Sequence, residues 1–301
     1  HLCDRRQRQM CIRDRIKDFT KPVDIPAVDV PAGYTTLFVF PYSVGFQFSG
    51  FKNLAALNEA ITKRLKNLGV TTLLFMRHLE LIEYEIKIPG KEASGEYLLD
   101  AEPVNDHCTR VSAIESEDDK TDESLSFIKF SMPIDSRVST RTIDVAFTVA
   151  TDKEGKTTFQ KAKNPYISVY FPTETESKLD FIVQGPFRTT PNRSSVPADE
   201  EENEALAEQT AKLLRQSVLE LRDMGLLDLS LIRILPLDED DFDVYPLFYP
   251  LYEEMRDLFS SERVLPVKDG KGYTKAANAV IARSRELACL LYTSPSPRDC
   301  S

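Results

Sequence analysis

The chain has few of the residues that build disulfide frameworks, zinc sites or membrane spans. It contains five cysteines and three histidines among 301 residues. It also has no run of about 18 apolar residues, the length that a transmembrane helix requires. Basic residues are outnumbered, since 38 Lys and Arg face 48 Asp and Glu, for a net charge of −10. This acidic balance argues against binding to nucleic acid or to an anionic membrane surface.

Both ends of the chain are typical of translated sequencing adapter. Met10–Asp14 can be encoded by ATGTGTATAAGAGAC, and Cys289–Ser294 by TGTCTCTTATACACATCT. The reverse complement of the first DNA string lies inside the second, as expected for a transposon-based library adapter. A basic arm that binds nucleic acid would leave this match unexplained. We therefore exclude residues 1–15 and 289–301 from the expected fold, and we expect residues 16–288 to be a library fragment of a longer protein.

Excluding the ends leaves one cysteine, Cys108, and two histidines, His78 and His107. A single thiol excludes a disulfide framework or a cysteine-based zinc site within the segment, which fits a reducing cytoplasm. A serine hydrolase needs a histidine beside a serine and an acid, and no GxSxG motif accompanies either histidine. The ends also carry six Arg and three Asp, so the remaining segment is more acidic still.

The pattern of apolar residues predicts an α+β fold, in which a mostly antiparallel β-sheet with packed helices precedes an α/β C-terminal part. Helical spacing predicts a helix over 53–68. Strand patterns then dominate as far as residue 183. Within them we expect an acidic hairpin loop at 115–124, a bulge between Phe127 and Ile128, and a strand with one buried face at 143–149.

The last third of the segment is predicted to be largely helical. Asp199 and Glu202 resemble a capping box at the start of a long amphipathic helix, which ends before Gly225. Short strands are expected at 231–237 and 264–267, and further helices over 246–260 and 274–287.

Two further segments invite a functional interpretation. Asp238–Asp243 is acidic, but Asp243 and Tyr249 stand where an EF-hand needs Gly and Glu, so we expect a solvated loop and no metal site. The aromatic run Phe242–Tyr252 fits either a partner-binding face or the apolar face of a packed helix. Exposed aromatic patches are uncommon, which favours the packed helix.

The loop Gly185–Ser195 is the strongest candidate for a functional site. It carries Arg188 and Arg193, with no carboxylate between Asp180 and Asp199. A cationic loop before a helix N-terminus is a candidate anion site, and arginine binds phosphate bidentately. The residues that we expect to assist are Thr189, Thr190, Asn192, Ser194 and Ser195, together with the amides of the following helix. The alternative is that one or both arginines pair with acidic neighbours such as Asp199 or Glu200.

Residues 171–197 (FPTETESKLDFIVQGPFRTTPNRSSVP) and 226–237 (LLDLSLIRILPL) resemble the sacsin-like branch of the HtpG-type chaperone family. The resemblance covers most of 33–288. In that family an ATPase domain of the gyrase, HtpG, histidine-kinase and MutL (GHKL) superfamily precedes a middle domain. The resemblance implies that 16–50 is the C-terminal edge of that ATPase domain, 51–197 a β-rich middle domain with the arginine loop, and 198–288 a helical α/β subdomain.

In the family, the middle domain sends an arginine to the γ-phosphate of ATP from a pattern close to Asn-x-Ser-Arg-Glu. The resemblance implies this role for Arg193, within Asn192-Arg193-Ser194, with Arg188 as the rival. The chain departs from the pattern, because no residue separates Asn192 from Arg193 and no Glu follows.

The resemblance also implies ATP and Mg²⁺ as cofactors, held mainly by an N-terminal ATPase domain of the same chain. A client or partner protein is implied as well, and the fragment alone is not expected to hydrolyse ATP. The alternative is a non-catalytic protein-interaction module without a functional ATPase partner. A nucleic-acid-processing ATPase of the MutL or gyrase kind is disfavoured by the acidic charge.

Overall fold

The computed structural model describes residues 53–76, 78–117, 120–135, 138–267 and 272–279. The chain divides into two compact units, residues 1–57 and 58–301. The elements that follow Leu57 belong to the second unit. The expected edge of an ATPase domain lies outside the described residues, as do both adapter-like ends.

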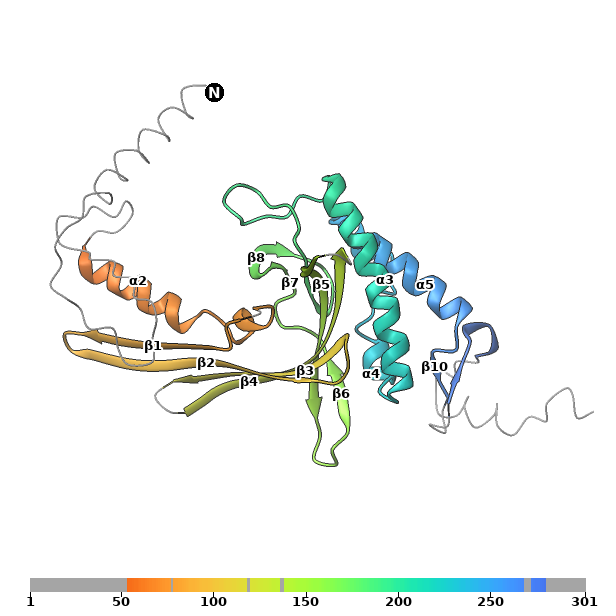
Figure 1. Cartoon of the computed structure of the whole chain (residues 1–301), viewed down its shortest axis with the longest axis horizontal. Coiled ribbons are helices and arrows are strands. Elements are labelled where there is room, and N and C mark those ends of the chain that lie inside the picture. The colour runs from red at the N-terminus through yellow and green to blue at the C-terminus, as the bar shows by residue number, and fades with distance from the viewer. Residues whose placement is uncertain (1–52, 77, 118–119, 136–137, 268–271, 280–301) are drawn as a thin grey trace, which may run out of the picture. The chain divides into compact units, whose positions relative to one another are not determined.

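A large sheet is the main feature of the second unit (Figure 1). Its strands lie in the order β1-β2-β3-β4-β5-β9-β7-β8, and β6 pairs with β5. Among the described strands of this sheet, the β7–β9 pair is parallel and the other pairs are antiparallel. The strands are β1 (Leu81–Ile88), β2 (Lys91–Pro103), β3 (Cys108–Glu117), β4 (Lys120–Asp135), β5 (Val138–Thr151), β6 (Thr157–Gln160), β7 (Tyr166–Val169), β8 (Phe171–Glu176) and β9 (Ile182–Gln184).

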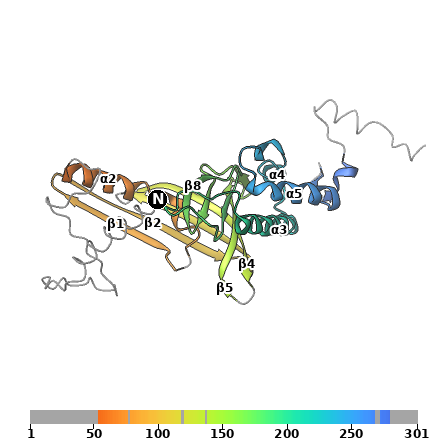
Figure 2. The same ribbon diagram turned by 90° about the horizontal axis from the view of Figure 1, so that it is seen from above.

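Two helices pack together on part of this sheet. Helix α3 (Glu201–Asp223) contacts β4, β5 and α5 (Tyr249–Ser261), and the two helices lie side by side in Figures 1 and 2. The remaining elements are α2 (Leu54–Lys66), α4 (Leu229–Ile232), the 3-10 turns η1 (Val70–Leu73), η2 (Asp240–Phe242), η3 (Pro246–Phe248) and η4 (Ala276–Asn278), and the ribbon β10 (Leu265–Pro266) with β11 (Tyr273–Thr274). The α+β class is therefore confirmed. No helix among the described residues is long and apolar enough to cross a membrane.

The central strands β4 and β5 are buried on both faces by different parts of the chain. One hydrophobic cluster joins Phe130 and Phe147 to α3 and α5, and a second joins Tyr97 and Phe127 to η1. Phe127 and Ile128 are 1% and 2% exposed, yet they belong to different clusters. The registers of β4 with β3 and β5 pass through both residues without a shift. The predicted bulge is therefore wrong, and the apolar run arises because both faces of β4 are covered.

Strand β5 also has two buried faces, where the sequence pattern predicted one. Phe147 belongs to the first cluster, and its neighbour Ala146 belongs to the second. Asp144 is buried and accepts hydrogen bonds from the hydroxyls of Ser131 and Thr142. Small or polar residues at alternate positions concealed the second buried face from an analysis of apolar periodicity.

The predicted acidic loop is largely strand. β3 continues to Glu117 and β4 begins at Lys120, so most of 115–124 belongs to the two strands. Strands can carry this many carboxylates only where the side chains remain in contact with water, and Glu115, Glu117 and Glu123 are all incompletely buried.

Two predicted C-terminal elements differ from the structure, the second of them in its described first residues. The segment expected to be a strand at 231–237 begins instead within the short helix α4. Asp228 caps that helix, because its carboxylate accepts hydrogen bonds from the amides of Ser230 (2.8 Å) and Leu231 (3.3 Å). The helix expected over 274–287 does not begin at Thr274, which lies in β11. Residues 280–287 lie outside the described part of the chain.

Candidate functional site

The arginine loop, Gly185–Ser195, connects the buried strand β9 to the segment before α3. Figure 1 shows it as the green loop that leads into α3. Its sequence explains why it leaves the sheet: Gly185 and Pro186 follow the strand, and proline lacks the N–H that would continue a ladder. Phe187 is buried and packs edge to face on Phe248, with ring centroids 5.9 Å apart. The base of the loop is thus held in the hydrophobic core.

The tip of the loop is a tight turn closed by its own hydrogen bonds. The amide of Arg193 donates to the carbonyl of Thr190 (2.8 Å), and the amide of Thr190 donates to the carbonyl of Ser195 (2.9 Å). The Asn192 side-chain oxygen accepts from the Thr190 hydroxyl (2.6 Å) and from the Ser194 amide (3.3 Å). Pro191 suits the second position of such a turn because its φ is fixed.

Arg193 has a left-handed backbone conformation, with φ of 60°. Residues with a Cβ atom rarely adopt this region, and the cost is roughly 1–2 kcal/mol. Two hydrogen bonds of the turn hold this conformation: the Arg193 amide bonds to Thr190, and the amide of the next residue, Ser194, bonds to the Asn192 side chain. The side chain of Arg193 is exposed, and the backbone that bears it is constrained by the turn.

The segment just after the tip is attached to β8 and to the C-terminal region. The Glu174 amide donates to the Ser194 carbonyl (2.8 Å), and the Val196 amide donates to the Thr175 hydroxyl (3.0 Å). The Tyr245 hydroxyl donates to the Val196 carbonyl (2.8 Å). Burial raises the pKa of Tyr245, so this phenol remains a neutral donor well into the alkaline range.

Asn203 joins the first part of the arginine loop to the segment just after the loop, and sequence analysis missed it. Its side-chain oxygen accepts from the Arg188 amide (2.7 Å), and its side-chain nitrogen donates to the carbonyls of Arg188 (3.1 Å) and Pro197 (2.8 Å). The residue is completely buried in the first turn of α3. One signal was present: Asn203 precedes Leu206 by three residues, which places an amide on the apolar face of the predicted helix.

The guanidinium of Arg188 is paired with the carboxylate of an acidic residue. Its Nε and Nη2 atoms donate to the two carboxylate oxygens of Glu202, at 2.5 and 2.6 Å. Hydrogen bonding and the charge of Glu202 raise the pKa of Arg188. The expected pairing with Asp199 or Glu200 is replaced by a bidentate pair with Glu202.

The predicted capping box at the start of α3 is therefore wrong. The residue at the N-cap is Glu200, and no side chain caps the helix there. Glu202 cannot complete a capping box because its carboxylate is turned toward Arg188. The amides of Asn203 and Glu204 donate instead to the Glu200 carbonyl.

Arg193 differs from Arg188 in having a free charge. Its side chain is exposed, and within the described part of the chain its guanidinium has no ion-pair or hydrogen-bond partner. The first turn of α3 carries Glu201, Glu202 and Glu204. These carboxylates oppose binding of an anion at the helix N-terminus. The loop tip, and not the helix terminus, is thus where an anion would meet uncompensated positive charge.

The other candidate polar residues of the loop divide into two groups. Thr190 and Asn192 are used in the turn itself, as described above. Thr189, Ser194 and Ser195 are half-buried; of these, only the Ser195 side chain has a bonding partner among the described residues, the Thr175 hydroxyl at 3.4 Å. Thr189 and Ser194 therefore keep hydroxyl groups near the tip that a ligand could use.

The sequence also singled out two histidines, an acidic segment and an aromatic run. His78 and His107 are both exposed, and no cluster of three or more metal-ligating side chains occurs among the described residues. In the aromatic run, Phe242, Leu247 and Phe248 are 0–3% exposed. The preferred interpretation, an apolar packed face, is therefore confirmed for these three side chains, although they lie in the turns η2 and η3 and not in one helix.

Comparison of the chain with protein-family models, with curated proteins and with solved structures finds no match.

Proposed function

We propose that this chain is the middle-domain part of an ATP-dependent, chaperone-like protein of the cytoplasm. In this proposal Arg193 contacts the γ-phosphate of ATP held by an N-terminal ATPase domain of the same protein. Closure of that domain on the arginine loop is then transmitted to a client or partner protein. A cytoplasmic setting suits Cys108, which is a free and fully buried thiol.

One observation carries the proposal: of the two loop arginines, only Arg193 presents an exposed guanidinium free of any partner within the described residues. A group that must meet a phosphate on another domain has to be accessible and uncompensated. Arg188 fails this requirement because Glu202 already fills its bidentate face. The constrained backbone at Arg193 also limits the entropy that would be lost when the contact forms.

The described residues fit a supporting role toward ATP better than a primary binding role. They contain one free arginine at a loop tip with nearby hydroxyls, which suits a contact to terminal phosphate oxygens. They contain no cluster of carboxylates arranged to hold Mg²⁺. In the proposal, ATP supplies the phosphoryl group and the N-terminal domain holds the nucleotide and its metal ion. Arg193 stabilises negative charge on the phosphoryl group during transfer.

The test requires the ATPase domain expected upstream in the parent gene. The 301-residue chain and that domain are purified together, and ATP turnover is measured with wild type, Arg193→Ala and Arg193→Lys. We expect Arg193→Ala to lower the rate by about 10³-fold or more, the usual worth of an arginine finger. Lysine should restore little of it because it lacks the planar fork.

Two results would contradict the proposal. One is ATP turnover by the 301-residue chain without an added domain. The other is a parent gene whose upstream region encodes no ATP-binding motifs, which would leave Arg193 without a nucleotide.

A further inference from the structure

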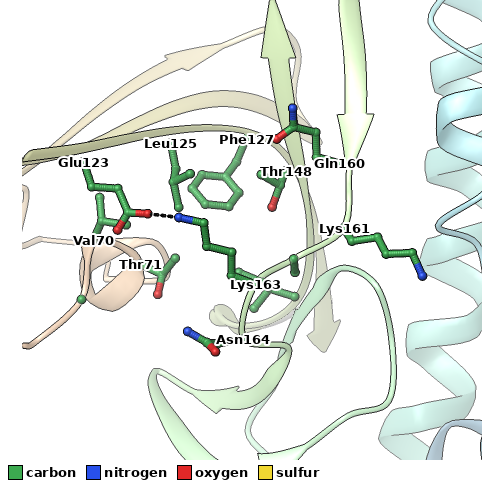
Figure 3. Close-up of a pocket in the computed structure, with 13 residues that line it drawn as sticks. Val70, Thr71, Glu123, Leu125, Phe127, Thr148, Gln160, Lys161, Lys163 and Asn164 are labelled. Atoms are coloured by element: carbon green, nitrogen blue, oxygen red, sulfur yellow. Dashed lines mark hydrogen bonds and ion pairs between the residues drawn. The ribbon is translucent and has the colours of Figure 1, made fainter.

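A small cavity lies on the second hydrophobic cluster of the sheet, away from the arginine loop. It has a volume of about 120 Å³ and is bounded by the start of η1, by β4 and β5, and by the segment 160–164 (Figure 3). Its floor is apolar, formed by Val70, Leu125, Phe127 and Ile182. A dry cavity of roughly 150 Å³ holds benzene, so this floor has room for an aliphatic group of three or four carbons.

Two opposite charges stand at the rim of the cavity. Lys163 Nζ lies 2.5 Å from a carboxylate oxygen of Glu123, and Figure 3 shows the lysine reaching from segment 160–164 to β4. The Lys163 side chain is 73% exposed and that of Glu123 is 34% exposed. An ion pair this exposed contributes little to stability, so its two charges can be redirected to a ligand at small cost.

A hydroxyl inside the cavity has no partner. Thr148 is 6% exposed, and Figure 3 shows its oxygen directed into the cavity. Among the described residues no donor or acceptor bonds to this hydroxyl. Among the described residues the buried side-chain oxygen or nitrogen without a partner is Gln184 Oε1, so the Thr148 hydroxyl is accessible from the cavity. The hydroxyl is therefore available to a polar group that is bound in the cavity.

We propose that this cavity binds a small zwitterion with a short aliphatic group, of the class of aliphatic α-amino acids. The ligand carboxylate binds Lys163, and its ammonium group binds Glu123. The aliphatic side chain covers Phe127 and Leu125, and the Thr148 hydroxyl supplies the third polar contact. Both rim charges keep a partner of opposite sign, so the exchange leaves neither of them unpaired. This site is independent of the proposed ATP-dependent function.

The first test is calorimetric titration of the 301-residue chain with valine and two matched analogues. 3-Methylbutanoate keeps the anionic group and the isopropyl group, and isobutylamine keeps the ammonium and the isopropyl group. We expect saturable binding of valine. Each analogue should bind about tenfold more weakly or worse, because it leaves one rim charge without its contact. Equal binding of all three ligands, or none with valine, would overturn the proposal.

Variants at the cavity give the second test. Lys163→Met and Glu123→Gln should each weaken valine binding by about tenfold or more. The matched control is Lys161→Met. Lys161 also borders the cavity, but its ammonium group pairs with Asp180 at 2.7 Å and points away in Figure 3, so this variant should bind valine like wild type. A loss in the control equal to that in Lys163→Met would contradict the assignment.

Thr148→Val separates binding from folding. It keeps the side-chain shape and removes only the hydroxyl, so valine binding should weaken. The melting temperature of the ligand-free chain should change little, because no hydrogen bond among the described residues is lost. Unchanged valine affinity in this variant would exclude Thr148 from the site. N-acetylvaline amide, which is uncharged, serves as the last probe: if it binds as tightly as valine, the cavity accepts apolar side chains of peptides and the zwitterion proposal is wrong.

Discussion

The base and the tip of the arginine loop are built by opposite means. The base is held by buried side chains: Phe187 packs in the core, and Asn203 bonds to Arg188 in the loop and to Pro197 just after it. The tip is held by short-range bonds within five or six residues, and it presents Arg193 to solvent. Two arginines five positions apart therefore have different surroundings: one is paired with a carboxylate and the other is unpaired among the described residues. Arg188 forms an ion pair with Glu202 in the first turn of α3. Arg193 lies at the exposed tip and has no ion-pair partner among the described residues.

The largest expected loss of stability tests the base. Asn203→Ala leaves one buried amide and two carbonyls without their partner, so we expect the free energy of unfolding to fall by about 3 kcal/mol. Urea titration followed by circular dichroism measures this change. The matched control is Asn192→Ala at the exposed tip, which should cost about 1 kcal/mol or less. Equal losses in the two variants would show that the base is no better held than the tip.

A smaller effect is expected at the attachment of the segment after the tip. Tyr245→Phe removes one hydrogen bond to the Val196 carbonyl, and we expect a loss of about 1 kcal/mol.

The pKa of Tyr245 is raised in the folded state. The stability that it contributes is therefore present below the unfolded-state pKa of about 10 and is lost as the pH rises through the folded-state pKa. Melting temperatures measured from pH 8 upward should decline above pH 10, and less steeply in Tyr245→Phe. A decline of the same slope in both proteins would contradict this role.

One substitution at the tip should raise the stability of the fold and not lower it. Arg193→Gly removes the Cβ atom from a residue with φ of 60°, so we expect stability to rise by about 0.5 kcal/mol once the greater freedom of glycine in the unfolded chain is counted. Arg193→Ala keeps the Cβ atom and should show no such gain. If both variants gain equally, the left-handed conformation of Arg193 carries no strain.

The smallest effect is expected where Arg188 meets Glu202. Both side chains are exposed, and exposed ion pairs contribute little because water and salt screen them. Glu202→Gln should leave the melting temperature almost unchanged at 150 mM salt. A marked drop would mean that the pair supports the base of the loop along with Asn203.

The fold class followed from the sequence, but several elements did not. Apolar periodicity predicted a strand-rich region as far as residue 183, yet it missed most of β3 and misjudged Phe127 and Ile128 because it assumed one buried face. The helix α4 was hidden inside an apolar run, although Asp228 before Ser230 carried a capping signal that was missed.

The site was predicted as a loop with two arginines, and the choice between them stayed open. The partner of Arg188 depends on how the loop folds back on the first turn of α3. Residues 188 and 202 are 14 positions apart, so no spacing rule brings them together. The role of Asn203 was equally hidden from the sequence. Its three hydrogen bonds reach Arg188 and Pro197, which come close to it only because the whole loop packs against α3.

The phosphate contact proposed for Arg193 is tested by comparing the two loop arginines in one assay. Single-turnover ATP hydrolysis is measured with the upstream ATPase domain present, using Arg193→Ala and Arg188→Ala, which make the same chemical change at the tip and at the base. We predict a loss of about 10³-fold or more for Arg193→Ala and a rate close to wild type for Arg188→Ala. Equal losses, or a greater loss for Arg188→Ala, would contradict the assignment of the phosphate contact to the free arginine at the tip.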